Sequence, residues 1–214
     1  MEIHLNILLI SGSQRDHAKS VDIANYLQSN ILNNMEGIHS SILDLSLYPF
    51  LLDHYGIGRD DSSELTKNKE EVLSQLYGCD AVVFIAPEWG GMIPPALVNL
   101  LLLTANGSAN GLPLGHKPAF AIGVSASSGG SNPISLLKAY AAKNSHLTWL
   151  PLHAIIQNVD EFLAHAWTPK LDDRYSQVQS RLLVGLQSLI IYAKQLASVR
   201  EELVVLSKVH PFGQ

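Results

Sequence analysis

Three short segments of the 214-residue chain combine residue types that suit the binding of a ligand. In the first segment, Ser13 and Arg15 follow an apolar run and precede a helical pattern. Hydroxyls and backbone N–H groups at the start of a helix attract an anion, and arginine pairs with phosphate through two hydrogen bonds. Ser20 comes one helical turn later and could face the same anion. The alternative is ordinary capping of the helix by Ser13 or Asp16, with Arg15 in solvent.

The second segment is an apolar run that ends in a glycine pair. Residues 81–86 are continuously apolar and rich in β-branched and aromatic side chains, as expected of a parallel strand buried on both faces. The loop Pro87-Glu88-Trp89-Gly90-Gly91 follows, and Pro94-Pro95 suit the first turn of a helix. The glycines allow a tight turn or a flat ligand against the backbone, while Trp89 and Met92 offer apolar contact area. A turn without a ligand is the alternative.

The third segment follows the apolar run 119–124 and is made of small residues, namely Ser125, Ser127, Ser128, Gly129 and Gly130. Their hydroxyls and amides could approach a ligand from the side opposite the second segment. An anion site at one end and a surface for a flat, polar-edged ring at the other suit a mononucleotide, and a flavin fits best. Hydrolytic chemistry has little support, because Ser125 lacks the second glycine of a nucleophile elbow. The nine histidines include no His-x-x-x-His pair, so a metal site is not predicted.

An α/β scaffold is needed to bring these segments together. Strand-like and helical patterns alternate along the chain, which predicts a parallel sheet with helices on both faces. Five strands suit the flavodoxin-like order 2-1-3-4-5, a three-layer fold whose crevice lies at the first and third strands. The loops after strands one, three and four then share one edge of the sheet. The predicted strands are residues 5–10, 41–45, 81–86, 119–124 and either 148–152 or 153–157.

The helical patterns and the connections between them indicate one domain over residues 1–214. Residues 47–63 form a long connection, either a surface excursion or a functional lid. The predicted helices cover about 21–32, 65–76, 96–103, 133–142 and a long C-terminal stretch from about 172 to 206.

Composition and charge narrow the class of protein. A net charge of −5 and a pI near 5.9 argue against a nucleic-acid partner, which needs a clustered basic face. The longest apolar runs are too short or interrupted to span a bilayer. The first residues lack the basic region and cleavage site of a signal peptide, and the single cysteine, Cys79, fits a reducing compartment. We therefore expect a cytoplasmic protein.

Extended by Pro94-Pro95-Ala96-Leu97-x-Asn99 and by His116-Lys117-Pro118-Ala119, the three segments resemble the NADPH-dependent FMN reductase family from about residue 5 to about residue 160. The resemblance implies bound FMN, NAD(P)H as co-substrate and a homodimer or homotetramer. It assigns the FMN phosphate to Ser13, Arg15 and Ser20, one side of the isoalloxazine to residues 87–91, and the other side to residues 125–130. It also implies hydride transfer from NAD(P)H through FMN to a flavin, quinone, azo or similar small-molecule acceptor, in a ping-pong cycle without a catalytic acid or base.

Three positions depart from the family pattern. Ala18 stands where the family often has a hydroxyl, Gly90 stands where asparagine is common, and no arginine lies near Lys138. Loss of one hydrogen bond to phosphate costs on the order of 1.5–3 kcal/mol, so weaker FMN binding is expected. A flavin-binding module or electron carrier with little NAD(P)H turnover is the alternative function. In either case Glu88 is expected to accept backbone N–H groups rather than act as a general base.

Overall fold

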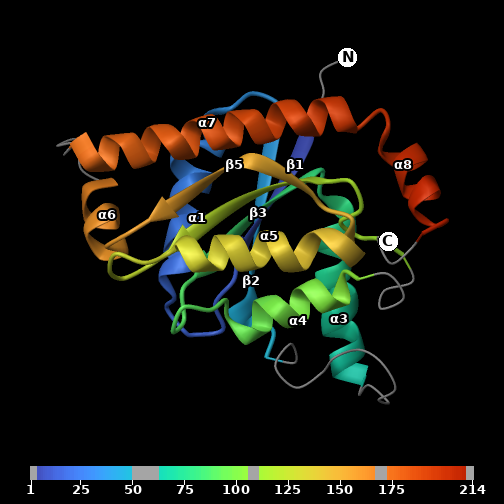
Figure 1. The fold of residues 1–214 in the computed structure, drawn as a ribbon, viewed down its shortest axis with the longest axis horizontal. Helices are drawn as coiled ribbons and strands as arrows, with labels where there is room; N and C mark the ends of the chain where they lie inside the picture. The colour runs from blue at the N-terminus through green and yellow to red at the C-terminus, as the bar shows by residue number, and fades with distance from the viewer. Residues whose placement is uncertain (1–3, 50–62, 106–110, 167–172, 211–214) are drawn as a thin grey trace.

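The computed structural model describes residues 4–49, 63–105, 111–166 and 173–210, and its framework is one parallel sheet. The strand order is β2-β1-β3-β4-β5, which confirms the predicted flavodoxin-like topology (Figure 1). In neighbouring strands Ser11 lies opposite Ile85, Pro87 opposite Val124, and Val124 opposite Ile156. The carboxyl ends of β1, β3, β4 and β5 therefore reach the same edge of the sheet. The strands are β1 (Leu5–Ser11), β2 (Ile38–Asp44), β3 (Ala81–Pro87), β4 (Pro118–Val124) and β5 (Thr148–Ile156).

Helices cover both faces of this sheet, as predicted. The described helices are α1 (Lys19–Asn30), η1 (Leu32–Asn34), η2 (Leu45–Leu47), α3 (Ser63–Gly78), α4 (Pro95–Leu103), α5 (Ser131–Ser145), α6 (Val159–Ala166), α7 (Asp173–Leu196) and α8 (Arg200–Ser207). Successive side chains of a strand point to opposite faces of the sheet. Since the central strands are apolar at almost every position, they supply two separate cores, one on each face. On one face Leu9 packs with α1, α6 and α7, whereas on the other Leu8 packs with α3, α4 and α5.

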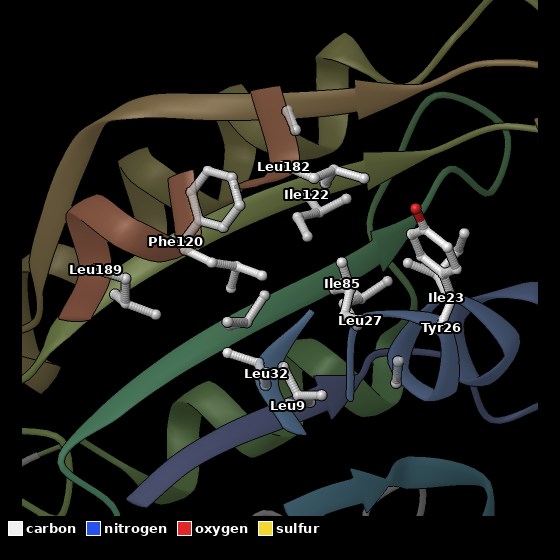
Figure 2. Packing of buried hydrophobic residues seen from close by; sticks show 14 of the residues in the cluster. Leu9, Ile23, Tyr26, Leu27, Leu32, Ile85, Phe120, Ile122, Leu182 and Leu189 are labelled. Carbon is white, nitrogen blue, oxygen red and sulfur yellow. The ribbon is translucent and has the colours of Figure 1, made fainter. Parts of the chain in front are cut away.

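The core under α7 fixes the distance between that helix and the sheet. Figure 2 shows Phe120 and Ile122 of β4 in the same cluster as Leu182 and Leu189 of α7. A Cβ atom added to Gly185 would lie 2.2 Å from the Phe120 ring, so this helix position accommodates no larger residue without movement. Glycine at position 185 therefore allows the backbone of α7 to approach the sheet closely.

The C-terminal stretch differs from the single long helix that its pattern predicted. Helix α7 ends at Leu196, α8 begins at Arg200, and the two are bent by 76° (Figure 1). The Ser198 hydroxyl donates to the carbonyl of Gln195, which helps satisfy the end of α7 as the chain turns. Helix α8 has no buried residue and is held by a 3.5 Å ion pair between Arg200 and Asp80.

The remaining differences are local. The fifth strand covers both of its predicted alternatives, and α6 was not predicted. Residues 50–62 of the predicted long connection lie outside the described residues. No single described helix is long and apolar enough to cross a membrane, although α7 and α8 taken together pass that test by length and composition. The apolar side of α7 lies in the core against the sheet.

Two cationic side chains from neighbouring helices bind backbone carbonyls of the outer strand β5. The Lys138 ammonium donates to the carbonyl of Leu150 at 2.9 Å, and Arg181 Nε donates to the carbonyl of His153 at 2.6 Å. Pro151 lies between these acceptors, where the pairing of β4 with β5 is irregular. An edge strand normally leaves such carbonyl groups free for other chains. On β5 the outward carbonyl of His153 is occupied by Arg181.

Candidate functional site

A cavity of about 210 Å³ lies at the carboxyl ends of β1, β3 and β4, where the topology predicts a ligand site. We call it the cleft. Its lining comes from Ser13, residues 15–19, residues 87–89, Val124, Ala126 and Val159. A larger cavity of about 630 Å³ lies between α1 and α7, but no charged side chain lines it. The cleft is therefore the better candidate for an anionic ligand.

The first wall of the cleft is the uncapped start of α1. The N-cap residue is Ala18, and among the described residues no side chain makes a capping hydrogen bond there. Ser13 is only 2% exposed, and its hydroxyl accepts from the backbone N–H of Arg15 at 3.1 Å. The alternative in which Ser13 or Asp16 caps this helix is thus not observed. An uncapped helix start beside Ser13, Arg15 and Lys19 has the charge and the donors to hold a phosphate.

Ser20, the third predicted phosphate ligand, does not line the cleft. Its side chain is fully buried, and its hydroxyl lies 2.9 Å from that of Ser11 at the end of β1. The position one turn into α1 faces the sheet rather than the loop, which the sequence spacing alone did not reveal. Ser20 therefore holds the start of α1 against β1, and an anion at this helix start would depend on Ser13, Arg15 and backbone amides.

The second wall is a tight hairpin around the predicted glycine pair. Gly90 and Gly91 have φ values of +57° and +81°, and Trp89 and Met92 exchange backbone hydrogen bonds of 2.9 and 3.0 Å. Two consecutive residues with positive φ define a type I′ turn, for which glycine is strongly favoured. The predicted tight turn is present. Neither glycine lines the cleft, whereas Pro87, Glu88 and Trp89 do.

Arg15 and Trp89 meet across the cleft. The guanidinium carbon of Arg15 lies 4.1 Å from the centre of the Trp89 ring, a cation–π contact. The two residues come from loops that are more than seventy positions apart in the sequence. Their contact places the predicted phosphate ligand on the surface predicted to hold the ring.

The third wall, residues 125–130, is tied to the second by Glu88. The Glu88 carboxylate accepts a hydrogen bond from the backbone N–H of Gly130, as predicted for this residue. A Cβ on Gly129 would lie 2.1 Å from the same carboxylate, so glycine at 129 leaves room for the contact. The Ser125 hydroxyl accepts from the backbone N–H of Ser127 at 3.2 Å, which shapes the turn.

The two exposed serines of this loop stay outside the cleft. Ser127 and Ser128 are exposed and are absent from its lining, whereas Ala126, which was not predicted, belongs to it. The side-chain amide of Gln157 donates to the carbonyls of Ser128 and Gly129, the latter at 3.3 Å. The third wall is therefore braced from two sides, although only part of it reaches the cleft.

The loop after β5 makes a contribution that the sequence analysis missed. Val159 lines the cleft, and Asp160 beside it pairs with Lys19 at 2.9 Å. The hydrogen bond to Asp160 is the main cause of the raised pKa of Lys19. The topology contained the signal for this loop, because the carboxyl ends of all strands in a parallel sheet reach the same edge. Lys19 thus adds a second cation at the start of α1.

Fold and cleft together define a flavodoxin-like protein whose cleft combines an uncapped helix start with an aromatic side chain. The sequence profile of NADPH-dependent FMN reductases matches residues 5–160, and the chain belongs to this family. Membership implies FMN as the cofactor and NAD(P)H as the co-substrate, as the sequence predicted. The donor set fits FMN, because Ser13, Arg15 and the start of α1 offer positive charge and donors that no described residue occupies.

Solved structures show the same fold at low sequence identity. An oxidoreductase from Corynebacterium diphtheriae is 14% identical with a TM-score of 0.64, over 94% of this chain and 99% of that chain. An NADH:FMN oxidoreductase, EMOB, is 15% identical with a TM-score of 0.64, over 89% of each chain. The flavoenzyme FerB from Paracoccus denitrificans is 16% identical with a TM-score of 0.61, over 89% of this chain and 98% of that chain. No curated protein sequence matches this chain.

Proposed function

We propose that this protein is an FMN-dependent NAD(P)H oxidoreductase that delivers electrons to a small flavin, quinone, azo or similar acceptor by a ping-pong cycle. The observation that carries the proposal is the uncapped start of α1 beside Ser13 and Arg15, directly across the cleft from Trp89. This arrangement pairs an anion site with an aromatic wall. The family match over residues 5–160 supports FMN as the ligand.

Different residues at the cleft bind the phosphate and the ring of FMN. The N–H groups at the start of α1, the Ser13 hydroxyl and the Arg15 guanidinium hold the phosphate. Pro87, Glu88 and Trp89 form one wall for the ring, shaped by the turn at 90–91. Val124 and Ala126 form the other wall, which belongs to β4 and to the 125–130 loop. FMN, when bound, supplies the redox chemistry by accepting hydride from NAD(P)H and passing electrons to the acceptor. No side chain needs to act as an acid or base, in keeping with the role of Glu88 as a backbone acceptor.

Assembly of the protein is part of the proposal. We propose a homodimer or homotetramer, and large apolar side chains on the exposed sides of α7 and α8 support it. Val184, Ile191, Val205 and Leu206 are 48%, 61%, 61% and 59% exposed. Burial of such a surface against a second copy would remove these side chains from water.

The function is tested by spectroscopy of the purified protein. We expect a flavin absorbance band after reconstitution with FMN, and bleaching of that band when NADPH or NADH is added without oxygen. Re-oxidation by menadione or free FMN would then show transfer to an acceptor. Failure to bind FMN would overturn the proposal. Binding without bleaching would overturn the turnover and leave the alternative, a passive flavin module.

A further inference from the structure

Arg15 is an exposed side chain of the cleft whose contact with Trp89 must change when a ring binds there. Its guanidinium lies 4.1 Å from the Trp89 ring centre. Within the described residues its side chain makes no ion pair or hydrogen bond, and it is exposed to solvent. The guanidinium is therefore available to an anion, which would bind it more strongly than the indole ring does. Arginine pairs with a phosphate through two hydrogen bonds, each about twice as strong as a neutral hydrogen bond.

The present position of Arg15 also limits the space for a ring. The cleft of about 210 Å³ is smaller than the roughly 300–1,000 Å³ typical of small-molecule sites. Its other walls are braced, because Glu88 holds the Gly130 amide and Gln157 holds the Gly129 carbonyl. Of the two long, exposed side chains in the lining, Lys19 is held by its ion pair with Asp160, so displacement of Arg15 is the simplest way to enlarge the cleft. The face of Trp89 under the guanidinium cannot accept a second flat group until Arg15 leaves.

We propose that the Arg15 side chain covers the ring face of Trp89 and moves off it when a phosphate binds at the start of α1. We call this role of Arg15 the cover. When no anion occupies the start of α1, the guanidinium stacks on the indole. The phosphate of an incoming flavin mononucleotide draws Arg15 towards Ser13 and uncovers the ring face for the isoalloxazine. The inference rests on the proposed FMN site, and it adds that Arg15 sets specificity by penalising flavins without a phosphate.

If Arg15 covers Trp89, its removal should change the affinities for riboflavin and FMN in opposite directions. Riboflavin lacks the phosphate and must displace Arg15 without compensation. A cation–π contact of this kind shifts an equilibrium constant by about two- to fivefold. Arg15→Gln should therefore tighten riboflavin binding by about two- to fivefold while weakening FMN binding by more than about tenfold. If Arg15 were merely a phosphate anchor, the affinity for riboflavin would not change.

The affinities are measured by quenching of flavin fluorescence with the full chain. The matched control is Arg174→Gln, because Arg174 also stacks on an aromatic ring, that of Tyr175 at 4.8 Å, but does not line the cleft. Both affinities of this control should equal those of the wild type. Unchanged or weaker riboflavin binding by the Arg15→Gln variant would overturn the cover.

A second measurement follows the indole directly with inorganic phosphate as the probe. The chain has three tryptophans, so the indole N–H signal of Trp89 in a ¹⁵N spectrum can be assigned from its loss in Trp89→Phe. We expect phosphate to move this signal to a plateau in the wild type and to leave it unmoved in Arg15→Gln. If FMN binds but phosphate does not move the Trp89 signal, Arg15 does not cover the ring, and the proposed function still stands. Failure of FMN to bind would overturn the proposed function, while the phosphate titration would still decide the cover.

Discussion

Among single residues, Glu88 holds the architecture of the cleft together. Its backbone N–H donates to the carbonyl of Val124 at 2.9 Å, and its carboxylate accepts from the amide of Gly130. Both partners belong to β4 or to the loop that follows it. Glu88 thus fixes the second wall against the third before any ligand binds. A site whose walls are already in place loses less entropy when it binds a ligand.

Removal of this link should weaken FMN binding. Glu88→Ala leaves the Gly130 amide without its charged acceptor, and we expect the dissociation constant of FMN to rise about tenfold. Glu88→Gln keeps an acceptor oxygen and should lose much less. Flavin fluorescence titrations measure both variants, and a wild-type affinity for Glu88→Ala would show that the link does not shape the site.

Gly129 offers an independent test of the same link. In Gly129→Ala the new methyl group would occupy the position of the Glu88 carboxylate, 2.1 Å away, and should displace it. We expect the same loss of FMN affinity as in Glu88→Ala. The matched control is Gly78→Ala, because a Cβ at that position meets nothing within 4 Å. An FMN affinity of Gly129→Ala equal to that of this control would contradict the prediction.

The predicted site shows what sequence spacing can and cannot reveal. Residue types and topology indicated that Ser13, Arg15 and Trp89 would meet, and all three line the cleft. Ser20 was placed wrongly relative to the cleft, because one turn of helix has two sides and only packing decides which one faces the sheet. The link from Glu88 to Gly130 was predicted in kind, but its partner was not, since backbone conformation fixes it.

At the scale of elements, the limits of sequence patterns appear in α7 and α8. The apolar stripe predicted a helix against the sheet, and Leu182 and Leu186 are fully buried there. The break at residues 197–199 was not predicted, because that stretch contains neither glycine nor proline. Its turn depends on contacts far away in the sequence, such as that of Arg200 with Asp80. Helix α6 was missed because its eight residues are too few for a clear period.

Gly185 should be essential for the packing of α7. Glycine inside a helix normally costs about 0.5–1 kcal/mol relative to alanine, so substitution would usually stabilise the protein. Here the added methyl group would press on the Phe120 ring, and overpacking costs about 1–3 kcal/mol. We expect Gly185→Ala to lower the free energy of unfolding by roughly 1–2 kcal/mol. Urea denaturation measures it, and a more stable variant would mean that α7 moves freely away from the sheet.

For the whole molecule, two histidines link stability to pH. Burial lowers the pKa of His116, and the nearby His146 lowers it further. Burial also lowers the pKa of His153, with Lys138 and Arg181 adding to the effect. The unfolded chain therefore takes up protons at these histidines before the folded protein does. Their contribution to stability is complete above the unfolded pKa near 6.5 and is lost as pH falls through it towards the lower folded values.

We therefore expect the free energy of unfolding to fall between pH 7.5 and pH 5.5, and His116→Asn to reduce that fall. Asparagine tolerates the positive φ of 54° at this position and does not titrate. Ser207→Ala is the matched control, because it removes the same 2.7 Å contact between His116 Nε2 and Ser207 Oγ while His116 still titrates. Urea denaturation at both pH values measures the slopes. An equally steep fall in His116→Asn would exclude His116 as a source of the dependence.

The occupied edge of β5 has a consequence for the behaviour of the protein at high concentration. Open sheets grow into aggregates when an outer strand recruits an extended segment from another molecule. A recruited strand would have to expel the Arg181 guanidinium from the His153 carbonyl, and would face Pro151, which donates no hydrogen bond. The protein thus carries its own barrier to strand-by-strand polymerisation along the β5 edge of the sheet.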